Sequence, residues 1–450
     1  MPELFTRLVS GLLFPVQESM KHHDTVAVRR RFEDSQWWSP DRLQRLQIQR
    51  LRALLLHAQQ HVPYYRDLFA RTHFEPETVT DVADLHALPF LDKATIRAHV
   101  EELKADDAQG LARFNTGGSS GEPLIFFIGR ERVSHDVAAK WRATRWWGVD
   151  IGDPEIVVWG SPIELSVQDR LRTLRDRLFR TELLPAFEMS EDRLDDFVSR
   201  IRTRRPKMLF GYPSALSHIA LHAERRGIPM NDLGIRVAFC TSERLYEHQQ
   251  AVIARVFGCS VANGYGARDG GFIAHQCPSG SMHITAEDLV LEIVDGEGRV
   301  LPPGQSGEVV VTHLATGDFP FIRYRTGDIA RLATAPCPCG RGLPVLESIQ
   351  GRATDFVTAA DGTVMHGLAL IYVLRDLPGV AEFRIIQHSL GLTRVQVVAG
   401  PGFGLDTESR IREGLRARLG QQVEVQVELQ SSIAPEKSGK FRYVLSHVAA

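Results

Sequence analysis

The chain lacks the features that mark several broad classes of protein. No apolar run is long enough to span a membrane. The 53 Lys and Arg residues nearly balance the 55 Asp and Glu residues, a formal net charge of −2, so no nucleic acid partner is expected. The five cysteines are an odd number and do not suit a fully paired disulfide framework, which favours a reducing, cytoplasmic location.

The N-terminus carries an apolar patch at residues 8–14, but it has neither a clear basic region nor a small-residue cleavage site. A secretory signal is therefore not expected.

The length of 450 residues exceeds that of one typical hydrophobic core, so two or more domains are expected. Short apolar strands alternate with helical patterns between about residues 156 and 258, which predicts a mostly parallel sheet covered on both faces. From about residue 285 the pattern alternates without helices, which predicts an antiparallel sheet, and the last hundred residues form a compact α+β pattern.

The predicted fold class is therefore α/β. A large N-terminal domain, residues 1–351, combines mostly parallel sheets covered by helices with a small antiparallel β subdomain. A small α+β C-terminal domain follows at residues 352–450. Residues 39–72 are expected to be helical, with Pro63 ending the helix that precedes it. Further helices are expected at about 130–147, 167–182 and 190–203. C-terminal strands are expected near 382–387, 393–398 and 423–427.

One stretch, residues 116–123, concentrates three glycines, two serines and a threonine before a proline. An Ala/Asp-rich helical stretch is expected before it, and a buried strand after it at residues 124–128. Free backbone amides and hydroxyls in such a loop can surround an anion such as a nucleotide phosphate, although many Ser/Gly-rich loops are only turns.

Polar turns follow two of the predicted parallel strands. Tyr212 to Ser214 come after one, and Thr241 to Glu243 come after another. In an open α/β sheet, ligands bind beyond the carboxyl ends of the strands. These turns are therefore expected to lie at a binding site.

Four residues have the composition of a structural zinc site: Cys277, His283, Cys337 and Cys339. Three thiolates and one imidazole form a tetrahedral donor set with no open position for water. Three buried free thiols are the alternative, and His275 is a rival ligand.

Four separated motifs then occur in order. They are residues 116–123, the segment Gly264 to Asp269, the pair of segments 324–328 and 351–355, and Ser438-Gly439-Lys440. Together they resemble the adenylate-forming superfamily of acyl-CoA synthetases, within it the phenylacetate–CoA ligase and CapK-type branch. The likeness covers nearly the whole chain.

The resemblance implies a role for each matching residue. Asp269 would hold Mg²⁺, Asp328 would bind the ribose hydroxyls with help from Arg352, and Lys440 would swing in against the α-phosphate, while Asp355 falls at the domain hinge. Phosphate binding falls to Thr116, Gly117, Gly118, Ser119, Ser120 and Gly121.

Further ATP-binding positions implied are Ser242, Glu243, Gly264, Tyr265, Gly266 and Arg268. The acyl pocket would be lined by Tyr212, Pro213 and Gly270. The residues expected to act in catalysis are Lys440, Asp269 and Thr116.

Taken alone, Asp328 could cap a turn and Lys440 could belong to a solvated basic tail. The chain also departs from the family pattern at two positions. Glu122 stands where a lysine is usual, and Asp269 replaces the usual glutamate.

The implied activity is ATP-dependent activation of a small carboxylic acid as its acyl-adenylate, with release of pyrophosphate. Transfer of the acyl group to coenzyme A would follow, with rotation of the C-terminal domain between the two steps. Two alternatives are an adenylating enzyme that acylates an amine or a hydroxyl, and a nucleotide-binding protein without turnover. The oligomeric state is open, with a homodimer among the options.

Overall fold

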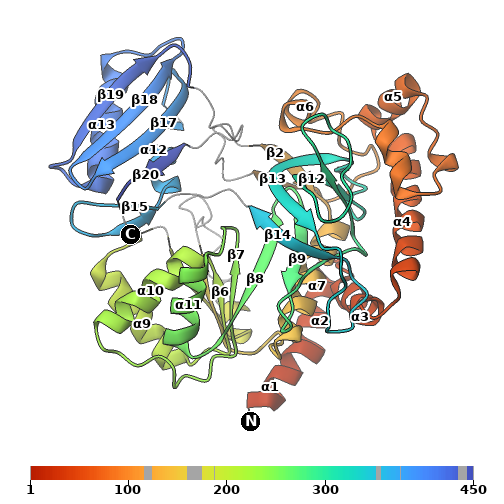
Figure 1. Ribbon diagram of the computed structural model, residues 1–450, viewed down its shortest axis with the longest axis horizontal. Helices are drawn as coiled ribbons and strands as arrows, with labels where there is room; N and C mark the ends of the chain where they lie inside the picture. Colours follow the sequence, from red (N-terminus) through yellow and green to blue (C-terminus); the bar gives the residue numbers. More distant parts are fainter. Residues whose placement is uncertain are drawn as a thin grey trace.

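The computed structural model describes most of the chain: residues 2–115, 124–159, 175–186, 188–350, 356–375, 377–433 and 443–448. Figure 1 shows a large unit that contains the main sheet and a smaller unit, built from the C-terminal residues, beside the helices α9 to α11.

The first hundred residues are helical. The helices are α1 (Pro2–Leu8), a π-helical turn (Val9–Leu13), α2 (Phe14–Met20), α3 (Thr25–Ser35), α4 (Pro40–His61), α5 (Pro63–Thr72), 3-10 turns at Pro76–Thr78 and Val82–Ala87, and α6 (Lys93–Ala98). The predicted helix at 39–72 is present as α4 and α5. Pro63 separates them because proline has no amide hydrogen to continue the hydrogen bonding of α4.

The main sheet has eleven strands in the order β11-β12-β13-β14-β10-β9-β8-β7-β6-β3-β4. The strands β4, β3, β6, β7 and β8 are parallel neighbours, and pairing becomes antiparallel from β9 onward. The α/β fold class is thus confirmed, and the antiparallel strands extend the same sheet.

The strand bounds are β3 (Glu155–Trp159), β4 (Thr181–Pro185), β6 (Met208–Gly211), β7 (Val237–Thr241), β8 (Ser260–Ala267), β9 (Gly271–Gln276), β10 (Met282–Ile284), β11 (Leu289–Val294), β12 (Ser306–His313), β13 (Tyr324–Leu332) and β14 (Val345–Gln350).

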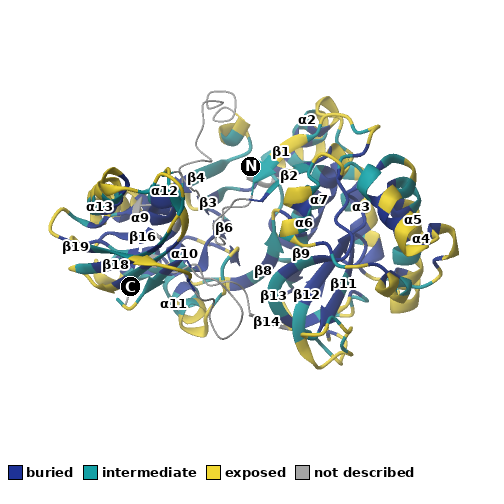
Figure 2. Ribbon diagram, turned by 90° about the horizontal axis from the view of Figure 1, so that it is seen from above, coloured by how far each residue is buried: buried dark blue, intermediate teal, exposed yellow. Residues whose placement is uncertain are grey.

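Helices cover both faces of the parallel strands. On one face lie α9 (Glu191–Arg204), α10 (Pro213–Arg225) and α11 (Glu247–Phe257), whose apolar side chains pack on Leu209 and Ala238. On the other face lies α7 (Arg130–Trp146), where Ala143 packs on Phe210 and Phe239. Figure 2 accordingly shows the central strands buried.

The C-terminal unit contains β15 (Phe356–Thr358), β16 (Val364–His366), α12 (Leu368–Arg375), β17 (Val380–Ser389), β18 (Leu392–Ala399), α13 (Leu405–Leu419), β19 (Glu424–Gln430) and β20 (Val444–Ser446). Its sheet has the order β19-β18-β17-β20, which confirms the three predicted C-terminal strands. The short strand β5 (Glu188–Met189) pairs with β16, so the backbone of the large unit is hydrogen-bonded to the C-terminal unit.

Two helical predictions are wrong in part. Residues before the Gly-rich stretch form strand β1 (Ala112–Asn115), which pairs antiparallel with β2 (Ile125–Ile128), because Phe114 packs on Phe126 across the hairpin. The helix expected at 167–182 lies outside the described residues up to 174, and its last residues give way to β4, whose Leu184 is fully buried in the sheet.

The N-terminal apolar patch lies on a helix that packs on the protein along one side only. Val9 and Phe14 are buried, whereas Leu8 and Leu12 are exposed.

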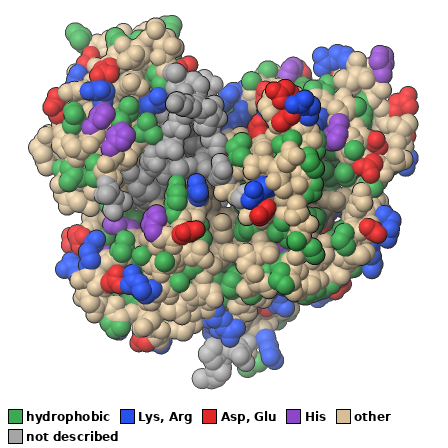
Figure 3. All heavy atoms as spheres, viewed as in Figure 1, with side chains coloured by type: hydrophobic (Ala, Val, Ile, Leu, Met, Phe, Trp, Pro, Cys, Tyr) green, Lys and Arg blue, Asp and Glu red, His purple; other side chains and the backbone are tan. Residues whose placement is uncertain are grey.

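Among the described residues, no helix combines the length and apolarity needed to cross a membrane. Basic and acidic side chains of the described residues are interspersed on the face in Figure 3.

Candidate functional site

Part of the predicted site lies outside the described residues: Thr116, Gly117, Gly118, Ser119, Ser120, Gly121, Arg352, Asp355 and Lys440. The remaining residues predicted to bind ATP or the acyl group come from two parts of the large unit. One is the carboxyl ends of the parallel strands, and the other is strand β13.

The parallel register places the polar turns at one edge of the sheet. Val158 of β3 is aligned with Gly211 of β6, Gly211 with Cys240 of β7, and Thr241 with Gly264 of β8. The turns that begin at Tyr212 and Ser242 therefore leave the sheet beside the last residues of β8, as the sequence predicts.

Two contacts join these turns. The Ser214 hydroxyl donates a hydrogen bond to a carboxylate oxygen of Glu243, which connects the start of α10 to the turn after β7. The rings of Trp159 and Tyr212 stack, with centroids 4.5 Å apart and planes 22° apart. Ser242 has φ of +70°, a left-handed conformation that costs a non-glycine residue energy and is concentrated at functional turns.

The aspartates Asp269 and Asp328 are held by two reciprocal hydrogen bonds. The Tyr265 hydroxyl of β8 donates to Asp328 Oδ2 at 3.0 Å, and the Tyr324 hydroxyl of β13 donates to Asp269 Oδ2 at 2.5 Å. Each tyrosine stands four residues before the aspartate of its own segment and binds the aspartate of the other.

Three strands separate β8 from β13 in the sheet order, so these bonds require the antiparallel strands to curl back over the end of β8. The two bonds differ in burial. Tyr324 is fully buried and Asp269 is 6% exposed, whereas Asp328 is half-buried.

Arg132, on the first turn of α7, supports the turn that carries Asp269. Its guanidinium donates to the backbone carbonyls of Arg268 at 2.8 Å and Asp269 at 3.0 Å, and pairs with Asp136 at 3.3 Å. Arg132 is almost fully buried, so the turn is fixed from beneath. Sequence reasoning missed this residue because no motif surrounds it.

Arg268 is exposed on the turn that carries Asp269. Partial desolvation lowers the pKa of its guanidinium, and the Tyr372 phenol of α12 partly offsets this effect.

Two glycines of the motif allow close approach of neighbouring chains. A Cβ at Gly264 would lie 2.7 Å from the Phe239 ring, and a Cβ at Gly266 would lie 2.5 Å from the carbonyl oxygen of Gly271. Larger residues at these positions would displace the end of β8. Gly270 is buried, and its amide donates to Asp269 Oδ1 at 3.2 Å. Pro213 occupies the first turn of α10.

The four predicted zinc ligands lie together at the junction of β9, β10 and the loop before β14. The sulfur atoms of Cys277 and Cys337 are 3.7 Å apart, and Cys339 Sγ is 3.3 Å from His283 Nε2. All four ligand atoms lie within 4.8 Å of one another.

A tetrahedral zinc ion with bonds of about 2.3 Å requires donor separations of roughly 3.8 Å, so this donor set fits the metal. His283 Nδ1 lies 3.3 Å from the Leu343 carbonyl, which orients Nε2 toward the sulfurs. Burial lowers the pKa of His283 to about 4, which keeps the imidazole neutral as a ligand must be. The rival His275 is not in the cluster; it stacks on Phe272 with ring centroids 5.4 Å apart.

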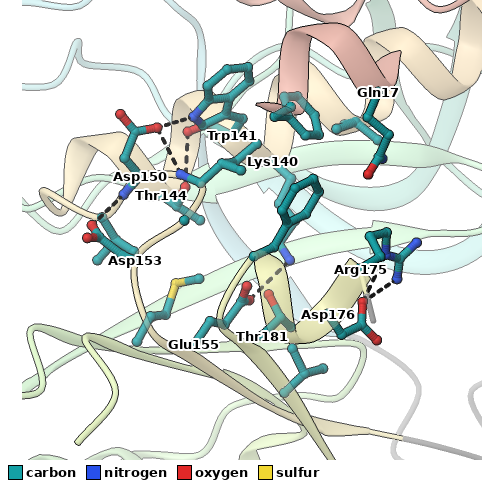
Figure 4. Close-up of a pocket in the computed structure, with 18 of the residues that line it drawn as sticks. Gln17, Lys140, Trp141, Thr144, Asp150, Asp153, Glu155, Arg175, Asp176 and Thr181 are labelled. Atoms are coloured by element: carbon teal, nitrogen blue, oxygen red, sulfur yellow. Dashed lines mark hydrogen bonds and ion pairs between the residues drawn. The ribbon is translucent and has the colours of Figure 1, made fainter. Parts of the chain in front are cut away.

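A cavity of about 310 Å³ lies at the opposite edge of the sheet, beside the first residues of β3, β4 and β6 (Figure 4). Its charged side chains are paired with neighbours: Lys140 with Glu155 at 3.3 Å, and Arg175 with Asp176. The cavity is remote from the carboxyl ends of the strands, so it has no part in the candidate site.

Comparison with known proteins identifies relatives along the whole chain. A family model described as the CapK C-terminal domain matches residues 357–447. Protein CapK of Staphylococcus aureus is 22% identical and aligns over 99% of this chain and 98% of its own. The phenylacetate-coenzyme A ligase of Pseudomonas putida is 28% identical over 71% of this chain and 72% of its own; that of Thermus thermophilus is 27% identical over 78% and 79%.

Solved structures show the same fold. A crystal structure of 2-hydroxyisobutyryl-CoA ligase with 2-HIB-AMP and CoA, in the thioesterification state, superposes with a TM-score of 0.65. It is 21% identical and covers 92% of this chain and 93% of its own. The same ligase in the postadenylation state gives a TM-score of 0.60. The resemblance inferred from the four motifs is confirmed.

Proposed function

Because this chain is a homologue of CapK and of phenylacetate-coenzyme A ligases, we propose that it is an AMP-forming acid–thiol ligase. A carboxylate oxygen would attack the α-phosphorus of ATP and release pyrophosphate, giving an acyl-adenylate. A coenzyme A thiolate would then attack the acyl carbon and release AMP. The observation that carries the proposal is the reciprocal pairing of Tyr265 with Asp328 and Tyr324 with Asp269, at the carboxyl ends of the parallel strands.

Asp269 suits the proposed magnesium ligand because Mg²⁺ prefers carboxylate oxygens. Its Oδ2 is oriented by Tyr324, its Oδ1 accepts from the amide of Gly270, and Arg132 fixes its backbone. The ion would neutralise charge that develops on the phosphoryl oxygens during transfer. Asp replaces the longer Glu of the family pattern, so this fixed backbone sets how far the carboxylate reaches.

Asp328 suits the ribose because one carboxylate can accept hydrogen bonds from two adjacent hydroxyls. Its position on the curled strand β13 brings it over the end of β8, where Tyr265 and Gly266 would flank the adenine. Ser242, Glu243, Gly264 and Arg268 would complete the ATP site.

The remaining roles are assigned by the motifs alone. The loop Thr116–Gly121 would bind the phosphates, Arg352 would assist at the ribose, and Lys440 would contact the α-phosphate. A flexible point charge such as lysine suits that last task. The C-terminal domain, residues 352–450, would rotate about Asp355 between the two half-reactions.

The acyl pocket would lie beside the stacked rings of Trp159 and Tyr212, with Pro213 and Gly270 at its border. Flat aromatic faces favour an aryl or other apolar acid, because such a substrate can stack on them. An aryl acid is accordingly the first substrate class to test.

The sulfur cluster would hold a structural zinc ion through Cys277, His283, Cys337 and Cys339. With four protein ligands, the ion would have no open position for a reacting water. Its role would be to fasten the loop before β14 to strands β9 and β10.

The test is turnover with a panel of aryl, aliphatic and amino acids in the presence of ATP, Mg²⁺ and coenzyme A. We expect a thioester and AMP with at least one aryl or apolar acid. The same reaction without coenzyme A should accumulate acyl-adenylate, which hydroxylamine would trap. Failure of every acid to give either product would contradict the proposed activity.

The same assay tests other acceptors, since CapK aligns over 99% of this chain whereas the phenylacetate-coenzyme A ligases align over 71–78% of it. Decay of the adenylate with an amine or a hydroxyl compound, but not with coenzyme A, would favour the alternative acceptor. A cytoplasmic location and a homodimer remain predictions.

A further inference from the structure

A second group of metal-binding side chains lies outside the candidate active site, at the end of α4. His57 and His61 stand one helical turn apart on the same face of this helix, and their rings stack with centroids 4.8 Å apart. Asp107 faces both rings: its Oδ1 is 3.8 Å from His57 Nε2 and its Oδ2 is 3.7 Å from His61 Nδ1. We call these three residues the histidine cluster.

The backbone around the histidine cluster is fixed. The Asp106 amide donates to the His61 carbonyl at 2.8 Å, and the Ala105 amide donates to the Asp318 carbonyl at 3.0 Å. Gly317 lies against the ring of His57, where an added Cβ would approach the ring to 3.2 Å. The backbone of residues 105–106 is therefore held against α4 before any ligand arrives, which lowers the entropy cost of binding.

The charges around the cluster favour a cation. Asp106, Asp107 and Asp318 surround the two imidazoles, and burial together with the Asp107 carboxylate raises the pKa of Asp318. Arg66 pairs with Asp106 at 3.4 Å, and Arg130 offsets part of the effect on Asp318.

His57 Nε2 is enclosed and makes no hydrogen bond within the described part of the chain. A buried polar atom in this position gains a partner when a metal ion binds between it and Asp107.

We propose that His57, His61 and Asp107 bind a divalent transition-metal ion, such as Zn²⁺ or Co²⁺. Two imidazole nitrogens and one carboxylate oxygen form a borderline donor set that favours these ions over Mg²⁺ and Ca²⁺. A tetrahedral ion with bonds of about 2.1 Å needs donor separations of roughly 3.4 Å, a few tenths of an ångström shorter than those to Asp107.

The side chains of His57, His61 and Asp107 are 32%, 36% and 49% exposed, so an ion can enter and water can complete its coordination. The ion would exchange more readily than one in the sulfur cluster.

The position of the histidine cluster suggests what the ion would do. The segment at 105–107 leads into β1, which ends directly before the Gly-rich stretch, and the turn at Gly317-Asp318 leads toward β13. A bound ion would fasten the segment at 105–107 to α4, next to the turn at Gly317-Asp318. Metal binding itself does not depend on the proposed ligase activity.

The test is cobalt binding to the full chain after removal of metal, counted by equilibrium dialysis and followed by absorbance. Cobalt in the sulfur cluster gives a thiolate charge-transfer band, whereas cobalt in the histidine cluster does not. We expect two bound cobalt ions per chain, one in each cluster. If the sulfur cluster stays empty, we expect one bound cobalt ion and no thiolate charge-transfer band. His57→Ala and His61→Ala should each remove one equivalent and leave the band unchanged.

His99→Ala is the matched control, because His99 is an exposed histidine paired with Glu102 outside the cluster. It should bind as much cobalt as the unmodified chain. Asp107→Asn, which keeps the side-chain volume, guards against misfolding and should weaken the same equivalent about tenfold or more. Equal cobalt binding by the unmodified chain and by all three cluster variants would overturn the proposal.

Discussion

The two tyrosine–aspartate pairs of the candidate site are alike in sequence and unlike in environment. Tyr324 and Asp269 are buried, and the backbone of Asp269 is held by the buried guanidinium of Arg132. Tyr265 is also buried, whereas its partner Asp328 is only half-buried. The same type of tyrosine-to-aspartate hydrogen bond thus fixes a buried carboxylate in one pair and leaves the carboxylate accessible in the other.

This difference suits the two roles proposed for the aspartates. A metal ligand, the role proposed for Asp269, must keep one geometry while charge develops on the phosphate, which its buried position favours. A ribose-binding carboxylate must exchange water for two hydroxyls at each turnover, so it remains half-exposed. The variants below separate the two tasks.

The largest effect is expected for Asp269→Asn. Loss of the charged magnesium ligand removes stabilisation that is needed in the transition state. The rate of adenylate formation should fall by about 10² to 10³-fold. Single-turnover measurement of pyrophosphate release at saturating ATP checks this. A loss below threefold, in protein with an unchanged melting temperature, would remove Asp269 from the metal site.

Asp328→Asn should act mainly on ATP binding. A hydrogen bond to a charged group contributes about 1.5–3 kcal/mol, so the KM for ATP should rise roughly tenfold to a hundredfold. The value of kcat should change much less. Separate determination of kcat and KM under steady-state conditions distinguishes this result from the result for Asp269→Asn. Equal losses in kcat for both variants would show that the two pairs share one task.

The tyrosine variants compare the two hydrogen bonds directly. Tyr324→Phe leaves the buried Asp269 carboxylate with one partner fewer and should reduce stability by about 2 kcal/mol and kcat by about tenfold. Tyr265→Phe should raise the KM for ATP only a few-fold, because water can replace the phenol at the half-exposed Asp328. Denaturant unfolding and steady-state kinetics measure both. A larger stability loss for Tyr265→Phe would reverse the assignment of the rigid pair.

The smallest effect on catalysis is expected from removal of zinc. Cys337→Ser should lower the melting temperature while the folded enzyme keeps kcat within about twofold, because the sulfur cluster supplies no group to either pair. Metal analysis should show one zinc ion fewer per chain. Full activity loss in a variant that remains folded would place the cluster in the reaction.

The sequence predicts the parts of this architecture that depend on local patterns. The buried strand Val237–Thr241 and the strand Leu392–Ala399, buried at alternate residues, are present because their apolar spacing determines which side faces the core. The sequence also predicts the meeting of Cys277, His283, Cys337 and Cys339, because three thiolates and one imidazole form a tetrahedral zinc set and a Cys-Pro-Cys-Gly turn can present two sulfurs together.

Other features depend on the curvature of the sheet and could not be predicted. The approach of β13 to the end of β8, which allows both tyrosine–aspartate pairs, depends on twist accumulated over the strands between them. Strand β1 was missed because its pairing with β2 depends on a partner across the Gly-rich stretch. The buried Arg132 is invisible to periodicity, since arginine normally lies on the surface.

The central claim is that the chain joins a carboxylic acid to AMP. It is tested most directly by exchange of labelled pyrophosphate into ATP across a panel of aryl, aliphatic and amino acids. We predict exchange that depends on one class of acid, needs Mg²⁺ and is lost in Asp269→Asn. ATP binding without exchange for any acid would contradict the claim and favour a nucleotide-binding protein without turnover.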